Sequence, residues 1–176
     1  VSATGPGGTN AITGVAASWI DSVPLIVISG QVKSEDLLKG KKVRQMGFQE
    51  VDIVSLVRPI TKYAVTVTDP DSIKFYLEKA VYLAKEGRPG PVWIDIPLDV
   101  QAAMVDIRKL KGFKKSSPKK QKADFLLKFN RLVDLVNKSK RPVILAGNGI
   151  RSQEAVHCLK RLVDRLKIPV LTTWKA

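Results

Sequence analysis

Hydrophobic and polar residues follow one another along the first hundred positions in a pattern that predicts helices alternating with buried strands. Apolar side chains recur every three or four residues from 12 to 20, the spacing of a helix that packs one face against a core. Pro24 ends this helix, and the run 25–29 is short and uniformly apolar, as in a buried strand. Further helices are expected at 51–57 and 71–86, and further strands at 62–67 and 91–96. The polar, aperiodic stretch 30–49 is expected to be a long loop.

The same alternation continues in the last third of the chain. It predicts a helix over 126–136, a strand in RPVILAGNG that enters a glycine turn, a helix over 159–166 and a last strand in IPVLTTW. Helices and strands in turn predict an α/β fold of parallel sheets with helices on both faces. Two strands cannot bury a sheet by themselves, so this part is expected to be cut from a larger domain. We expect parts of two domains, 1–100 and 123–176, joined by a basic linker over 101–122.

The formal net charge is +14 over 176 residues, and its distribution bears on the interpretation of one segment. Much of this charge lies in IRKLKGFKKSSPKKQK, residues 107–122, which carries no acidic residue. Segments that bind nucleic acid usually combine such charge with several aromatic residues, and this stretch has Phe113 alone. We interpret the stretch as a solvated linker. The alternative from another class is a basic nucleic-acid-binding module that uses 107–122.

Other features of the composition limit the class of protein. A single cysteine, Cys158, excludes an internal disulfide and fits a reducing compartment. No apolar run is long enough to cross a membrane, so we expect a cytoplasmic protein without a membrane partner. His157 stands without companion ligands, and Asp69 and Asp71 are placed to cap a helix, so no metal site is assigned.

The first ten residues, VSATGPGGTN, place several glycines directly before an apolar helix. The segment lacks the Lys-Ser/Thr pair of a phosphate-binding loop, and it misses the three-glycine spacing of a dinucleotide-binding turn. Taken alone, these glycines are equally explained by a plain tight turn that leads into a helix.

Four motifs, in order, give the sequence a resemblance to a known family: TGPGGTNAITGVAASWIDSVPLIVISGQV, FQEVDIV, RPITKYAVTV and EGRPGPVWIDIPLDV. Together they resemble the large subunits of acetolactate synthase, the thiamine-diphosphate-dependent enzymes of branched-chain amino acid biosynthesis. The resemblance implies that 1–100 is the back half of a pyrimidine-binding domain with the thiamine-diphosphate-binding fold. It also implies that 123–176 is the start of a Rossmann-like central domain.

In this family the glycine-rich segment faces the aminopyrimidine ring of thiamine diphosphate, a flat ring that needs a backbone without side chains. The implied cofactor contacts are Gly5, Pro6, Gly7 and Asn10. Gln49 matches an active-site glutamine, whose amide can both donate to and accept from a 2-keto acid substrate. Phe48 matches a phenylalanine of the substrate channel, for which core packing is the other explanation. Glu50 has no cofactor role in the family, and we expect it to be a solvated residue in the first turn of a helix.

Some members of the family also contain FAD. Arg88 in GRPGP matches an arginine that contacts FAD in those members. The other matching positions are Gly147, Asn148 and Gly149 in the glycine turn, and Thr173 and Trp174 after the last strand. A strand-to-helix turn with glycines offers N–H groups to an anion. Many central domains of the superfamily keep this fold without a nucleotide, so FAD binding stays open.

The resemblance implies an enzyme that decarboxylates pyruvate and joins the product to a second carbonyl, as a homodimer or tetramer with thiamine diphosphate and Mg²⁺. The catalytic glutamate is expected before Val1 and the Mg²⁺ motif far beyond Ala176, so the chain alone is expected to be inactive. The sequence departs from the family at 44–47, at Lys33 in place of a proline, and at Leu98 in place of the lysine of P-K-D-V. Because these positions line the substrate entrance, a related lyase or transferase of a surface-polysaccharide pathway is the alternative within the family. A non-catalytic nucleotide-binding regulatory subunit is the third alternative.

Overall fold

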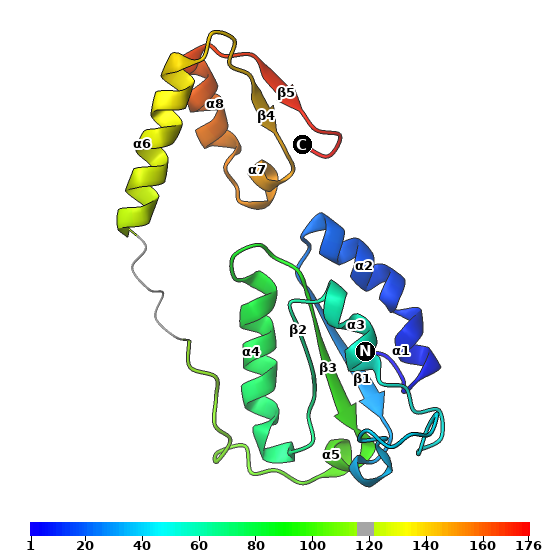
Figure 1. Cartoon of the computed structure of the whole chain (residues 1–176). Coiled ribbons are helices and arrows are strands. Elements are labelled where there is room, and N and C mark those ends of the chain that lie inside the picture. The colour runs from blue at the N-terminus through cyan, green and yellow to red at the C-terminus, as the bar shows by residue number, and fades with distance from the viewer. Residues whose placement is uncertain (116–121) are drawn as a thin grey trace. The chain divides into compact units, whose positions relative to one another are not determined.

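The computed structural model describes residues 1–115 and 122–176, and the chain divides into two compact units, Val1–Ser116 and Ser117–Ala176. Figure 1 shows the elements of both units, which we describe one at a time. Within the described ranges, no helix combines the length and the apolar character that a membrane crossing requires.

The N-terminal unit is built on a three-stranded parallel sheet in the order β1-β3-β2. Its strands are β1 (Leu25–Gln31), β2 (Tyr63–Thr66) and β3 (Pro91–Pro97). The helices are α1 (Pro6–Asn10), α2 (Ile12–Asp21), α3 (Ile53–Val57), α4 (Ile73–Lys85) and α5 (Leu98–Ala102). Three short 3₁₀ turns, η1 (Ser34–Asp36), η2 (Arg58–Ile60) and η3 (Pro70–Ser72), complete the unit. The carboxylate of Asp69 accepts from the N–H of Asp71 at 3.1 Å, which confirms its predicted capping role.

Helices cover both faces of this sheet, because alternate residues of a strand point to opposite sides. Trp93 of β3 packs in one buried cluster with Val15 of α2 and Ile53 of α3. Its neighbours Val92 and Ile94 pack on the other face, in the cluster that contains α4. Figure 1 shows α2 and α3 on one side of the sheet and α4 on the other. The predicted fold class is therefore confirmed.

The glycine-rich segment is a turn of helix rather than a loop. Pro6 occupies the first position of α1, where the N–H that proline lacks would have no partner within the helix. Gly5 precedes it with φ of +54°, in the left-handed region that favours glycine. The expected loop 30–49 is also shorter at its start, because β1 continues to Gln31 and η1 follows soon after.

The C-terminal unit contains α6 (Lys122–Lys138), β4 (Ile144–Ala146), α7 (Gly149–Ser152), α8 (Val156–Leu166) and β5 (Val170–Thr172). Strands β4 and β5 pair in parallel. Among the side chains described here, Ala146 is the single buried hydrophobic residue, at 4% exposure.

Part of the expected linker packs against α4. The Phe113 ring lies 5.7 Å from that of Phe75 and 5.4 Å from that of Tyr82, and its N–H donates to Glu78 Oε2 at 2.7 Å. Lys115 Nζ lies 5.1 Å from the centre of the Tyr82 ring. The expectation of a fully solvated stretch is wrong here, because aromatic residues of α4 provide the partners that Phe113 lacks within its own segment. The rest of the expected linker, 116–121, lies outside the described residues.

Candidate cofactor and substrate site

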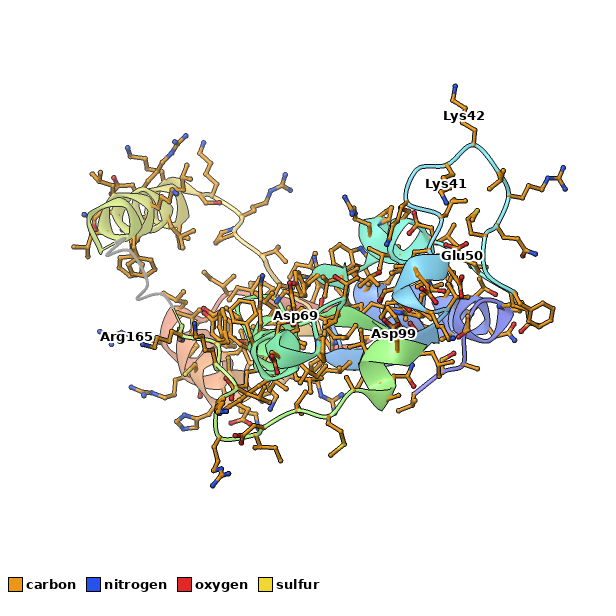
Figure 2. All side chains as sticks on the ribbon, turned by 90° about the horizontal axis from the view of Figure 1, so that it is seen from below. Lys41, Lys42, Glu50, Asp69, Asp99 and Arg165 are labelled. Atoms are coloured by element: carbon orange, nitrogen blue, oxygen red, sulfur yellow. The ribbon has the colours of Figure 1, made fainter. Side chains whose placement is uncertain are left out.

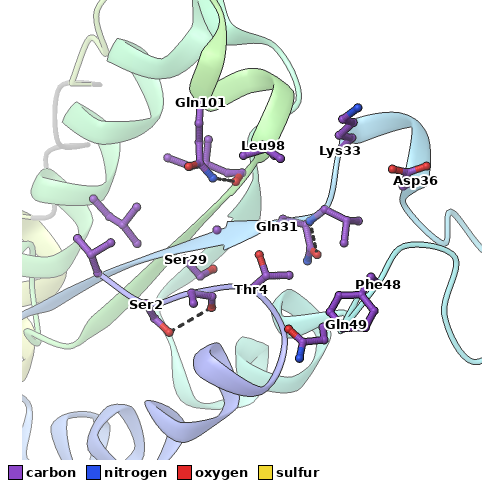
Figure 3. Close-up of a pocket in the computed structure, with 16 residues that line it drawn as sticks. Ser2, Thr4, Ser29, Gln31, Lys33, Asp36, Phe48, Gln49, Leu98 and Gln101 are labelled. Carbon is purple, nitrogen blue, oxygen red and sulfur yellow. Dashed lines mark hydrogen bonds between the residues drawn. The ribbon is translucent and has the colours of Figure 1, made fainter.

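A pocket of about 600 Å³ opens beyond the carboxyl ends of β1 and β3, and Figure 3 shows the residues that line it. This is the edge at which parallel α/β sheets bind their ligands. Main-chain and side-chain atoms of residues 1–4 and 28–33 form its floor. Phe48 and Gln49 border it on one side, and Leu98 and Gln101 of α5 on the other.

The structure thus brings together both residues that the sequence analysis assigns to the active site. Phe48 is 83% exposed, so the alternative that it packs in the core is wrong. Gln49 adopts φ of +60°, an uncommon conformation for a residue other than glycine. Lys33 and Asp36 are the charged side chains of the described lining. The roles assigned to Phe48 and Gln49 remain predictions.

The glycine-rich segment contacts this site through its backbone. A Cβ added to Gly5 would lie 1.9 Å from the main-chain oxygen of Gln49, so only glycine allows the two segments to meet. Gly47 has a similar part, because a Cβ there would lie 2.7 Å from the side chain of Val32. The pocket is lined by the residues just before Gly5; the predicted cofactor contacts Gly5, Pro6, Gly7 and Asn10 are not in its lining.

A buried carboxylate lies beneath the pocket floor. Asp95 of β3 is 1% exposed and pairs in register with Ser29 of β1 and Thr66 of β2. Trp93 Nε1 donates to Ser29 Oγ at 2.7 Å, and the Ser29 hydroxyl donates to Asp95 Oδ1 at 2.5 Å. Gln31 Nε2 and Thr66 Oγ1 donate to Asp95 Oδ2 at 3.1 and 3.2 Å. These donors stabilise the ionised form of a carboxylate that has lost its contact with water.

Burial raises the pKa of Asp95, and its hydrogen bonds from Ser29, Gln31 and Thr66 act in the opposite direction. The apolar pattern of 91–96 predicts a buried strand and does not single out this group. The available signal was an acidic residue inside an otherwise apolar strand, since a buried charge needs dedicated partners. Ser29 and Gln31 also line the pocket, so Asp95 fixes part of its floor.

A side chain of α5 holds the first turn after β1 in place. Asp99 Oδ1 accepts from the N–H of Ser34 at 2.8 Å and from its hydroxyl at 3.2 Å. The hydrogen bond from the Ser34 N–H lowers the pKa of Asp99. This contact anchors the chain directly after Lys33.

The prediction that Glu50 is a solvated residue in the first turn of a helix is wrong. Helix α3 starts only at Ile53, and Asp52 caps it by accepting from the N–H of Ser55 at 3.1 Å. Glu50 is half-buried, and its carboxylate accepts hydrogen bonds from main-chain N–H groups of the preceding loop. A local pattern could not reveal this, because one of the donors lies twelve positions away.

The proposed flavin contacts lie in two places. Arg88 lies before the amino end of β3, where its Nε donates to Ser22 Oγ at 2.6 Å, and it is not in the pocket lining. In the C-terminal unit, the turn after β4 and the end of β5 come together: the N–H of Thr173 donates to the carbonyl of Ala146 at 2.9 Å. Gly147 lies beside Thr173, and Trp174 is 99% exposed.

Comparison with known proteins defines the class. Residues 1–56 match the family described as thiamine pyrophosphate enzyme, N-terminal TPP binding domain. Residues 129–176 match the family described as thiamine pyrophosphate enzyme, central domain. The chain belongs to the thiamine pyrophosphate enzymes, that is, the thiamine-diphosphate-dependent enzymes.

Within this class the chain is similar to acetolactate synthases. It is 40% identical to the probable acetolactate synthase large subunit of Methanocaldococcus jannaschii, over 98% of this chain and 29% of that protein. It is 36% identical to the acetolactate synthase large subunit of Lactococcus lactis, over 97% of this chain and 28% of that protein. It is also 36% identical to the chloroplastic acetolactate synthase 2 of Zea mays, over 98% of this chain and 26% of that protein. The chain spans less than a third of the length of these relatives, and the predicted family resemblance is confirmed.

Proposed function

We propose that this chain forms one wall of the active site of an acetolactate synthase-like enzyme that acts on 2-keto acids with thiamine diphosphate. The observation that carries the proposal is the pocket at the carboxyl ends of β1 and β3, which gathers Phe48 and Gln49 beside the glycine-rich segment. The similarity to acetolactate synthases over nearly the whole chain supports the same reaction class.

The residues of the chain fit the part assigned to them. Gln49 presents an amide that can donate to the carbonyl of a keto acid and accept from an amine. Phe48 is exposed at the pocket mouth, where an aromatic ring can exclude water from the reacting group. Gly5, Pro6, Gly7 and Asn10 form or border α1, which offers a flat ring a surface with few side chains. When bound, thiamine diphosphate supplies the carbanion chemistry of decarboxylation and ligation.

The proposal also covers the metal ion, the oligomeric state and FAD as a second cofactor. We assign Mg²⁺ to residues outside this chain and propose a cytoplasmic homodimer or tetramer for the complete enzyme. FAD is proposed at Gly147, Asn148, Gly149, Thr173 and Trp174 of the C-terminal unit, and Arg88 of the N-terminal unit is a separate candidate contact. In support, Gly147 lies beside Thr173, so the turn after β4 and the end of β5 meet at one edge of this unit. This edge is the carboxyl end of both parallel strands, where the ligands of α/β sheets bind.

The acceptor substrate is proposed to differ from that of typical members. Leu98 is 54% exposed at the pocket, and Lys33 lies across the same lining. An apolar side chain at 98 and a cation at 33 change where a charged group of the acceptor is stabilised. Comparing pyruvate, 2-ketobutyrate and aldehydes as acceptors in the complete enzyme measures this difference.

Gln49→Ala in the complete enzyme subunit tests the proposal. Turnover of pyruvate is expected to fall by about tenfold to a thousandfold, because one oriented hydrogen-bond donor contributes that much in a catalytic site. The matched control is Gln45→Ala, since Gln45 is exposed on the same loop and is not in the pocket lining. Equal effects of the two substitutions would contradict the assignment of Gln49.

A further inference from the structure

We propose that Glu50 is a positioning residue: its carboxylate fastens the loop 37–47 and thereby holds Phe48 and Gln49 at the pocket wall. That Glu50 fastens the loop is inferred from the geometry of its hydrogen bonds alone. Its effect on catalysis rests on the proposed function of Gln49.

One carboxylate joins the two ends of the loop. Glu50 Oε1 accepts from the N–H of Leu38, at the start of the loop. Glu50 Oε2 accepts from the N–H of Met46 at 2.8 Å and from that of Gly47 at 3.4 Å, at its end. Hydrogen bonds to a charged acceptor are about twice as strong as neutral ones. The loop is therefore closed by a single side chain.

The part of the loop between these ends carries positive charge. Lys39, Lys41, Lys42 and Arg44 are all exposed. Figure 2 shows Lys41 and Lys42 on the projecting loop and Glu50 near its base. Among the described residues, no side-chain hydrogen bond or ion pair connects 39–45 to another part of the chain. Like charges repel along this stretch, and the negative charge of Glu50 counteracts that repulsion.

The last residue of the loop and the residues that follow it are packed closely enough to transmit this constraint to the pocket. Gly47 lies against Val32, and the carbonyl of Gln49 lies against Gly5, in both cases with no room for a Cβ. On the other side of Glu50, the carbonyl of Val51 accepts from Gln31 Nε2 at 3.0 Å. Glu50 thus completes the restraint of the segment that carries Phe48 and Gln49.

The same geometry argues against a direct chemical role for Glu50. Both of its carboxylate oxygens accept from main-chain N–H groups, and its side chain is absent from the pocket lining. It therefore acts through its neighbours rather than on the substrate.

Hydrogen exchange on the 176-residue chain tests the fastening. Glu50→Gln replaces one acceptor oxygen by an NH₂ group that faces N–H donors, so the amides of Leu38, Met46 and Gly47 are expected to exchange about tenfold faster. Asp52→Asn is the matched control: it makes the same change in charge two residues away, and it is expected to affect the amide of Ser55 instead. If Glu50→Gln unfolds the N-terminal unit, the same amides are compared in Glu50→Asp, which keeps the charge. Unchanged exchange at these three amides overturns the proposal.

A double-mutant cycle in the complete enzyme tests the positioning. Glu50→Gln is expected to lower kcat with a smaller change in KM, and to add little to the loss caused by Gln49→Ala, because both changes disable the same group. Fully additive losses, or a fast-exchanging loop with unchanged kcat, overturn the positioning role. If Gln49→Ala has no effect while Glu50→Gln still releases the three amides, the proposed function of Gln49 fails and the fastening of the loop stands.

Discussion

The two units of this chain share one alternation of helices and parallel strands, and they differ in how much they bury. Trp93 on the central strand of the N-terminal unit is fully buried, whereas Trp174 at the end of the C-terminal unit is 99% exposed. A central strand with a neighbour on each side and helices on both faces removes whole side chains from water. Within the described residues, strands β4 and β5 pair only with each other, and most apolar residues of their unit are exposed.

This difference shows that a local pattern does not measure burial. Leu162 and Val15 both fall on apolar helical stripes, yet Leu162 is 47% exposed and Val15 is fully buried. The stripe indicates which face of a helix is apolar, and the layers around it decide whether that face is covered. Matched substitutions in the two units therefore test the comparison directly.

Trp93→Ala is expected to have the largest effect. Removing a fully buried aromatic side chain costs about 3–5 kcal/mol, because the cavity adds to the lost burial. The matched Trp174→Ala is expected to change stability by less than about 0.5 kcal/mol. Urea unfolding followed by circular dichroism measures both. Similar losses in the two variants would mean that Trp174 is packed in solution.

Asp95→Asn is expected to destabilise the N-terminal unit by about 1–3 kcal/mol at neutral pH. The new NH₂ group would replace an oxygen that now accepts either from Ser29 or from Gln31 and Thr66, so a buried donor would lose its acceptor. Asp164→Asn, at an exposed position of α8, is the control and is expected to be neutral. Thermal unfolding of both variants measures the difference, and equal stability would contradict the buried network.

The pH dependence of the free energy of unfolding gives a second test of the buried Asp95. Burial raises its pKa in the folded state, so the folded state binds this proton more tightly than the unfolded state. Its contribution to the free energy of unfolding is largest below about pH 3.9, the unfolded pKa, and declines as the pH rises through the folded pKa. The slope is at most about 1.4 kcal/mol per pH unit. Unfolding curves across this range are expected to lose this component in Asp95→Asn.

Gly5→Ala is expected to cost about 1–2 kcal/mol, because φ of +54° strains any other residue and the new Cβ meets the carbonyl of Gln49. The control in the C-terminal unit is Gly149→Ala, since an added Cβ there meets nothing within 4 Å. Denaturant unfolding of both variants checks the contrast. A neutral Gly5→Ala would show that the Gln49 segment can move away.

Phe113→Ala is expected to have the smallest effect, about 0.5–1.5 kcal/mol, from the loss of its aromatic contacts with Phe75 and Tyr82. Limited trypsin digestion is expected to cut faster after Lys111 and Lys114. Phe125→Ala is the matched control, because Phe125 is 66% exposed on α6. If Phe113→Ala does not change the cleavage rate, the segment is not held by α4.

From the amino-acid sequence, the order of the strands and longer helices, the parallel α/β class and the family could all be predicted. Those conclusions come from residues close together in the chain: the apolar stripe from 12 to 20, the apolar strands, and motifs such as FQE. The predicted cap at Asp69 belongs to the same kind of evidence, because the cap and its N–H donor at Asp71 lie two residues apart. That Phe48 and Gln49 lie at one pocket could also be predicted, because the two residues are adjacent in the chain.

The contacts that build the site depend on how distant segments of the chain fold together. Asp95 meets Ser29 and Gln31 across more than sixty positions of sequence, and Gly5 meets Gln49 because the fold brings α1 against the loop. Periodicity is a local property with a period of two or 3.6 residues, so it carries no information about such pairs. The burial of Asp95, the fastening of the loop by Glu50 and the packing of Phe113 all depend on which elements lie side by side, and only the folded chain sets that.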